Sequence, residues 1–81
     1  MNELQKFELN HLLQSAIFVD NHKIIQYRDK KNSNELLKKV HDFKFKYNIS
    51  TSDFKDYITE FYKNKLLPSQ ILLVFERIME N

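Results

Sequence analysis

The chain of 81 residues contains no glycine and no cysteine, and its single proline is Pro68. Glycine supplies the positive φ angles and the close backbone approach that phosphate-binding loops require. The sequence therefore excludes a P-loop, a Rossmann dinucleotide fingerprint and a nucleophile elbow of the G-x-S-x-G type. Without cysteine there is also no thiol nucleophile, disulfide or cysteine-ligated metal centre. A chain with so few helix breakers predicts an all-α fold.

The length predicts one helical domain over residues 1–81. A domain of this size buries only about 60% of the surface of its unfolded chain, so its stability depends strongly on packing. Hydrophobic residues make up 42% of the sequence, and seven Phe and four Tyr contribute large side chains. Because no disulfide or evident metal site is available, the core or a partner chain must supply the stability. A homo-oligomer is as compatible with the sequence as a monomer.

The sequence predicts neither a membrane span nor a signal peptide. Its longest apolar run, from Ile71 to Phe75, is far shorter than the roughly 20 residues that a span requires. The first residues include Glu3 and Lys6 and lack an apolar signal region. We therefore expect a cytoplasmic protein. The richness in Lys, Asn, Ile, Phe and Tyr is typical of AT-rich genomes and suggests a bacterial or phage source.

The spacing of apolar residues predicts a compact bundle of four or five short helices. Leu9, Leu13 and Ile17 recur at helical spacing, and Leu4 and Phe7 extend this stripe towards the N-terminus. The expected helices cover about residues 3–19, 22–31, 34–47, 51–64 and 68–79, with Pro68 at the first position of the last one. The polar residues 32–34 are expected to separate the second helix from the third.

Residues 16–27 admit an alternative. The runs 16–19 and 24–27 are both rich in β-prone residues, and residues 20–23 between them match a turn. A small hairpin there would make the fold α+β. We favour the helix because a lone hairpin is only marginally stable.

The clearest local pattern predicts a sharp corner between two helices at residues 48–54. Ser50 suits an N-cap, because its hydroxyl can accept a hydrogen bond from the amide of Asp53. Asp53 also lies near the positive end of the helix dipole. Ile49 and Phe54 have the spacing of a hydrophobic staple, and Asn48 suits a left-handed cap in place of glycine.

The sequence offers no catalytic or metal-binding arrangement, so we expect neither enzymatic activity nor a cofactor. His11, His22 and His41 lie too far apart along the chain for a metal-binding motif. Asp53 is explained by capping, and Asp56 and Glu60 by a solvated helix face. No pair of carboxylates stands out for acid–base work, which requires environments that separate their pKa values.

Positive charge is concentrated in the middle of the chain. Residues 22–46 hold eight Lys or Arg and three Asp or Glu, a net charge of +5, whereas both flanking parts are negative. This segment is the candidate footprint for nucleic acid or another acidic partner. The candidate residues are Lys23, Arg28, Lys30, Lys31, Lys38, Lys39, Lys44 and Lys46. The helix after the corner is net acidic, which disfavours its entry into a DNA groove.

The leading functional hypothesis is non-catalytic binding to a protein partner, as a regulator, inhibitor or adaptor. The helices carry more large apolar side chains than one small core is expected to bury, and exposed aromatic side chains are typical interface anchors. Nucleic-acid binding through residues 23–46 is the alternative. The candidate interface residues are Phe45, Tyr62, Leu67, Leu72, Phe75 and Met79.

Overall fold

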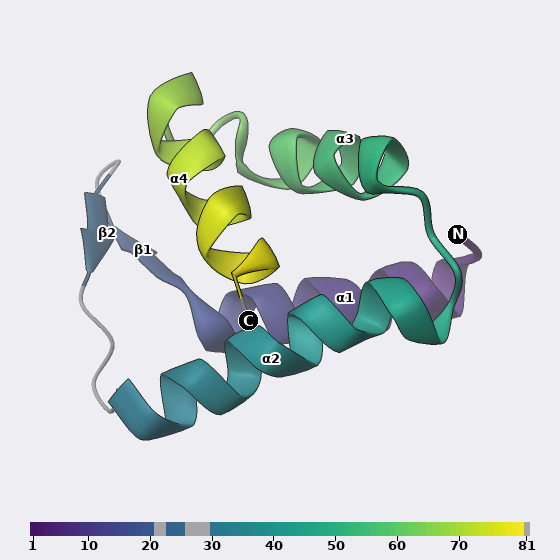
Figure 1. Cartoon of the computed structure of the whole chain (residues 1–81). Coiled ribbons are helices and arrows are strands. Elements are labelled where there is room, and N and C mark those ends of the chain that lie inside the picture. Colours follow the sequence, from purple (N-terminus) through teal and green to yellow (C-terminus); the bar gives the residue numbers. More distant parts are fainter. Residues whose placement is uncertain (21–22, 26–29, 81) are drawn as a thin grey trace.

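The computed structural model describes residues 1–20, 23–25 and 30–80, with the side chains of residues 1–17, 19 and 34–80. The chain forms four helices within these residues, which confirms the all-α fold. α1 and α2 run antiparallel and side by side, α4 crosses over them, and α3 packs against α4 (Figure 1). The helices are α1 (Glu3–Ala16), α2 (Lys30–Lys46), α3 (Thr51–Tyr62) and α4 (Pro68–Met79).

One hydrophobic core joins the four helices. Each helix contributes a buried row at helical spacing, so that every helix is held by side-chain packing against at least one other. Because this core is helical, an α+β fold class is not supported. The buried members are Leu9, Leu13, Ala16, Ile17, Leu37, Val40, Phe43, Phe54, Ile58, Tyr62, Leu66, Ile71, Val74 and Ile78.

The helix predicted over 22–31 is wrong where the structure describes it. Two short strands, β1 (Phe18–Asp20) and β2 (Lys23–Ile25), pair antiparallel, with Val19 opposite Ile24. β-branched side chains favour the pleated backbone over the helix, which accounts for the change of structure after α1. α1 ends at Ala16 rather than near Val19, because Ile17 already has extended backbone angles (φ −133°, ψ 117°).

The predicted break at residues 32–34 is also wrong. α2 begins at Lys30 and continues through these polar residues as one helix of 17 residues. Asn and Ser cost a helix only a few tenths of a kcal/mol each relative to better helix formers. Such a preference is overridden when the rest of the helix packs against the core, as α2 does through Leu37, Val40 and Phe43.

The corner between α2 and α3 is confirmed. Asn48 has a φ of 52°, the left-handed conformation that ends α2 without glycine. Ser50 is the N-cap of α3, and its Oγ accepts a hydrogen bond of 3.1 Å from the amide of Asp53. Ile49 is half-buried against the core and Phe54 is fully buried. Local chemistry thus fixes where α3 begins.

Tyrosine hydroxyls link α1 to the rest of the bundle. Tyr57 of α3 donates a hydrogen bond to the side-chain oxygen of Asn10. Tyr47, just after α2, donates to a carboxylate oxygen of Glu8 at 2.7 Å. Burial raises the pKa of Tyr57 above its ordinary value of 10.0. The protonated phenol is therefore the form that the folded chain favours.

We expect Asn48→Ala to lower the free energy of unfolding by about 1 kcal/mol, because a β-carbon without a compensating polar group disfavours the left-handed conformation. Asn48→Gly is expected to leave stability unchanged or to raise it. Urea unfolding of both variants measures the difference. Equal destabilisation by Ala and Gly would contradict a backbone explanation.

We expect stability to fall as the pH rises above about 10. In that range the unfolded chain releases the Tyr57 proton while the folded chain still holds it, so deprotonation favours unfolding. Thermal unfolding of the wild type and of Tyr57→Phe between pH 8 and 11 tests this, with a smaller decline expected for the variant. If the stability of Tyr57→Phe declines with pH as steeply as that of the wild type, titratable groups other than Tyr57 cause the decline.

Candidate protein-binding surface

The candidate surface is a groove between α3 and α4. The buried row of α3 consists of Phe54, Ile58 and Tyr62, and each of these is followed in the sequence by a residue that lines the groove. These following residues are Lys55, Thr59 and Lys63. Adjacent positions on a helix point about 100° apart, so this second row faces sideways towards α4 while the first enters the core.

α4 repeats the same arrangement with apolar residues. Its buried row is Ile71, Val74 and Ile78, and the residues one position further on are Leu72, Phe75 and Met79. Leu72 and Phe75 line the groove beside Ile71. Met79 lies at the end of α4, half-buried against the core. The groove therefore has an apolar wall on α4 and a polar, cationic wall on α3.

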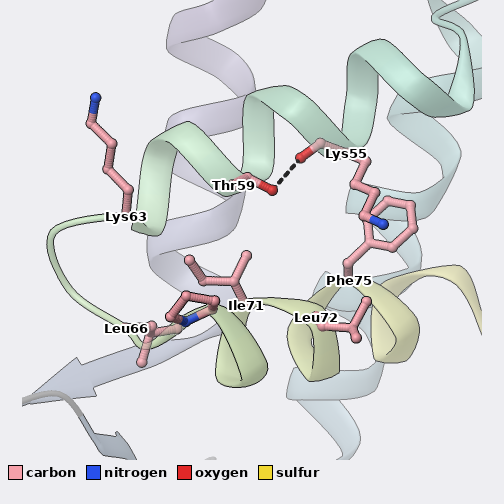
Figure 2. Close-up of a pocket in the computed structure, with 8 residues that line it drawn as sticks. Lys55, Thr59, Lys63, Leu66, Ile71, Leu72 and Phe75 are labelled. Carbon is pink, nitrogen blue, oxygen red and sulfur yellow. Dashed lines mark hydrogen bonds between the residues drawn. The ribbon is translucent and has the colours of Figure 1, made fainter.

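The groove has a volume of about 330 Å³ and opens to solvent. Leu66 and Pro68, which precede and begin α4, contribute to its lining. Figure 2 shows Ile71, Leu72 and Phe75 on the α4 side, facing Thr59 and the stem of Lys55 on α3. The Lys55 ammonium lies 5.8 Å from the centroid of the Phe75 ring, within the range of a cation–π contact.

Apolar side chains continue from the groove over the outer face of α4. Leu72 is 44% exposed, and Leu67 and Leu73 are each 60% exposed. Leu67 is the N-cap of α4, and Leu72 and Leu73 lie in the middle of this helix. Singly exposed apolar residues are common on proteins, but three exposed leucines on and next to one short helix, one of them in an apolar groove, are typical of an interaction surface.

Tyr62, one of the predicted interface residues, is buried. Tyr62 is only 1% exposed and belongs to the core, where its hydroxyl lies 3.5 Å from the carbonyl oxygen of Leu13. Its ring also packs edge-to-face against Phe61 at a centroid distance of 4.8 Å. A residue so deeply buried holds the fold together and cannot anchor a partner without unfolding.

Phe45 is exposed but lies outside the groove. It projects from α2 with 63% of its surface exposed, and its ring is 5.1 Å from that of His41. His41 Nδ1 is 3.1 Å from the carbonyl oxygen of Ile78, so Phe45 stands near the end of α4. The ammonium of Lys44 lies 4.8 Å from the Phe45 ring centroid and covers part of that ring.

Of the eight predicted cations, the structure describes the side chains of Lys38, Lys39, Lys44 and Lys46, and these four do not form one uninterrupted positive surface. Lys46 forms a 3.5 Å ion pair with Glu8, and hydrogen bonding to Tyr47 together with the charge of Glu8 raises the pKa of Lys46. Lys39 lines a small hollow beside Glu8 and Asp42. Of the remaining candidates, Lys38 is exposed and Lys44 half-buried; the side chains of Lys23, Lys30 and Lys31 are not described, and Arg28 lies outside the described residues.

Sequence reasoning missed two features. The sequence pattern does not indicate that Lys55 and Lys63 line a groove or that Leu73 is exposed, because both features depend on how α4 packs against α3. Sequence reasoning also placed Leu4 and Phe7 on the buried stripe, yet they are 77% and 73% exposed. They precede Leu9 by five and two residues, and at 3.6 residues per turn those spacings place them on the opposite face of α1. The spacing alone is therefore sufficient to predict that Leu4 and Phe7 lie on the exposed face of α1.

A second hollow, of about 570 Å³, lies between the start of α1 and the α2–α3 corner. Its lining combines Lys6 and the carboxylates of Asp53, Asp56 and Glu60 with apolar side chains such as Met1 and Ile49. Among the described residues no group of three or more His, Cys, Asp or Glu could hold a metal ion. No helix formed by these residues combines the length and apolar character needed to cross a membrane.

No family model, curated protein or solved structure matches this chain. The fold and the surface define a small helical bundle with an open apolar groove between its last two helices.

We expect Tyr62→Ala to lower the free energy of unfolding by about 3–5 kcal/mol, because it leaves a large cavity in the core. Leu72→Ala, which removes a half-exposed side chain of the groove, is expected to cost about 1 kcal/mol or less. Chemical denaturation of both variants compares them. A small loss for Tyr62→Ala would contradict the role in the core assigned to this side chain.

Proposed function

We propose that this protein is a non-catalytic protein-binding module, a regulator, inhibitor or adaptor that acts through α4 and the groove between α3 and α4. The observation that carries the proposal is the exposed apolar set Leu67, Leu72 and Leu73, which continues into the groove walls at Phe75 and Ile71. Covering this surface would remove apolar area from water without a change of fold.

The arrangement resembles the general anatomy of protein interfaces. Aromatic and aliphatic side chains at the centre of such interfaces supply most of the binding energy, and charged residues form the surrounding rim. Here the apolar residues of α4 form the centre, and Lys55, Lys63, Glu76 and Arg77 stand at exposed positions around it. This pattern supports a macromolecular partner with an apolar segment.

The alternative of nucleic-acid binding receives less support from the described residues. Carboxylates of Glu8 and Asp42 lie among the exposed lysines of α2, and Lys46 is already paired with one of them. A phosphate backbone binds most strongly to cations that face it without intervening carboxylates. Of the eight cations in residues 22–46, the four whose side chains the structure describes lie on the second half of α2 with Asp42 between them.

The test is capture of partners from a lysate of the organism that encodes the chain, with a matched pair of variants. Leu72→Asp places a charge in the groove, whereas Leu4→Asp makes the same change at another exposed leucine on α1. We expect Leu72→Asp to weaken capture of the bound protein roughly 30-fold, as loss of an interface anchor does. Leu4→Asp is expected to leave that capture intact.

A nuclease-treated lysate and a circular dichroism melt of each variant complete the experiment. Retention of the protein after nuclease treatment, with loss only in folded Leu72→Asp, supports the proposal. Capture that nuclease abolishes would favour the nucleic-acid alternative. Equal capture by both folded variants would show that the groove is not the binding surface.

A further inference from the structure

The groove has a one-sided charge pattern. Of its eight lining residues, two are lysines and none is a carboxylate. The described part of the chain shows no ion pair at Lys55, whose ammonium lies over the Phe75 ring instead. Lys63 pairs with Glu60 of the preceding helical turn, and both side chains are more than half exposed. Exposed pairs of this kind contribute at most about 1 kcal/mol, so a partner's carboxylate can replace Glu60.

The two lysines stand at opposite ends of the cationic wall. Lys55 lies on α3 and Lys63 is the residue directly after it, with helical backbone angles, so their separation of eight residues corresponds to about 12 Å along the helix axis. Between them the wall presents Thr59, whose hydroxyl donates to the backbone carbonyl of Lys55 at 2.8 Å. Opposite this wall lie Ile71, Leu72 and Phe75. The Lys55 ammonium lies over the Phe75 ring, whereas the Lys63 side chain extends away from Ile71 and its ammonium is paired with Glu60 (Figure 2). An occupant therefore meets apolar contacts along one side and Lys55 along the other, with Lys63 within reach at the far end once it leaves Glu60.

Both walls are helices, and this restricts the backbone of the occupant. The N–H and C=O groups within α3 and α4 are hydrogen-bonded inside each helix, so they cannot pair with an extended segment. An extended occupant would bury unpaired backbone groups, which is costly. A helical occupant satisfies its own backbone, and amphipathic helices bind in this way to apolar grooves.

We infer that the groove between α3 and α4 binds an acidic amphipathic helix of a partner protein, with the helix's apolar stripe against α4 and its carboxylates against Lys55 and Lys63. The inference rests on the proposed function and specifies its partner. Carboxylates seven or eight residues apart on the partner helix match the separation of the two lysines. The attraction between these charges sets the orientation and the preference among partners more than the total affinity.

The test uses three synthetic helical peptides that share one apolar stripe of Leu, Phe and Leu. They differ only at two positions eight residues apart, which carry Glu, Gln or Lys. Fluorescence anisotropy measures their binding to the full chain. We expect the Glu peptide to bind at least tenfold more tightly than the Lys peptide, and the difference to shrink as salt rises.

Charge reversal on the protein completes the test. The double variant Lys55→Glu/Lys63→Glu is expected to bind the Glu peptide at least tenfold more weakly than the wild type does. It is expected to bind the Lys peptide more tightly. The control, Lys38→Glu/Lys39→Glu, makes the same change in net charge at exposed positions of α2 and is expected to have little effect. If both double variants lose the same affinity for the Glu peptide, the attraction depends on the net charge of the protein and not on the groove, and the inference is overturned.

The remaining outcomes separate this inference from the proposed function. If the three peptides bind equally and Leu72→Asp still abolishes their binding, the groove is a docking site without charge preference and only the inference fails. If no peptide binds, and sedimentation shows a dimer that Leu72→Asp dissociates, a second copy of the chain occupies the groove and the inference is overturned. If no peptide binds and no dimer forms, the inference also fails, and the lysate experiment alone decides the proposed function.

Discussion

The structure depends on the way in which α4 is buried. This helix has apolar residues around most of its circumference, but the core covers only the row of Ile71, Val74 and Ile78. That row packs against the other helices and fixes the position of α4, and the carbonyl of Ile78 at its end is held by His41 of α2. Because a single helix cannot face the core on all sides, Leu72 and Leu73 remain in contact with water. The groove and the apolar surface both follow from this incomplete cover.

The same arrangement explains why α3 forms the other wall. Its aromatic and aliphatic row enters the core, and the adjacent row is polar and begins with a lysine that contacts Phe75. One helix thus supplies charge and the other supplies apolar area to the same groove. Neither wall alone would distinguish one partner from another, since an apolar strip accepts many occupants and isolated surface lysines attract acidic molecules only weakly.

The sequence predicts the fold well where local chemistry decides the structure. Pro68 correctly marks the start of α4, and Asn48 and Ser50 correctly place the α2–α3 corner, because caps and prolines act on the backbone next to them. It fails at Tyr62 and at the groove, where packing between residues far apart in the sequence determines which side chains are buried. The aromatic face of α3 includes both Phe61 and Tyr62, and its periodicity does not say which of them is fully buried; in the structure Tyr62 is buried beside Leu13 of α1, and Phe61 is half-buried. The candidate groove combines rows from two helices, so no periodicity within one helix reveals it.

The most direct test of a binding role for α4 is site-specific photo-crosslinking inside the organism that encodes the chain. A photoreactive phenylalanine analogue at position 72 lies in the groove, and the same analogue at position 38 lies on the exposed face of α2. A binding role predicts a protein adduct of defined mass at position 72, resistant to nuclease, and no such adduct at position 38. Adducts of equal yield at both positions, or none at position 72 while position 38 crosslinks to nucleic acid, would contradict it.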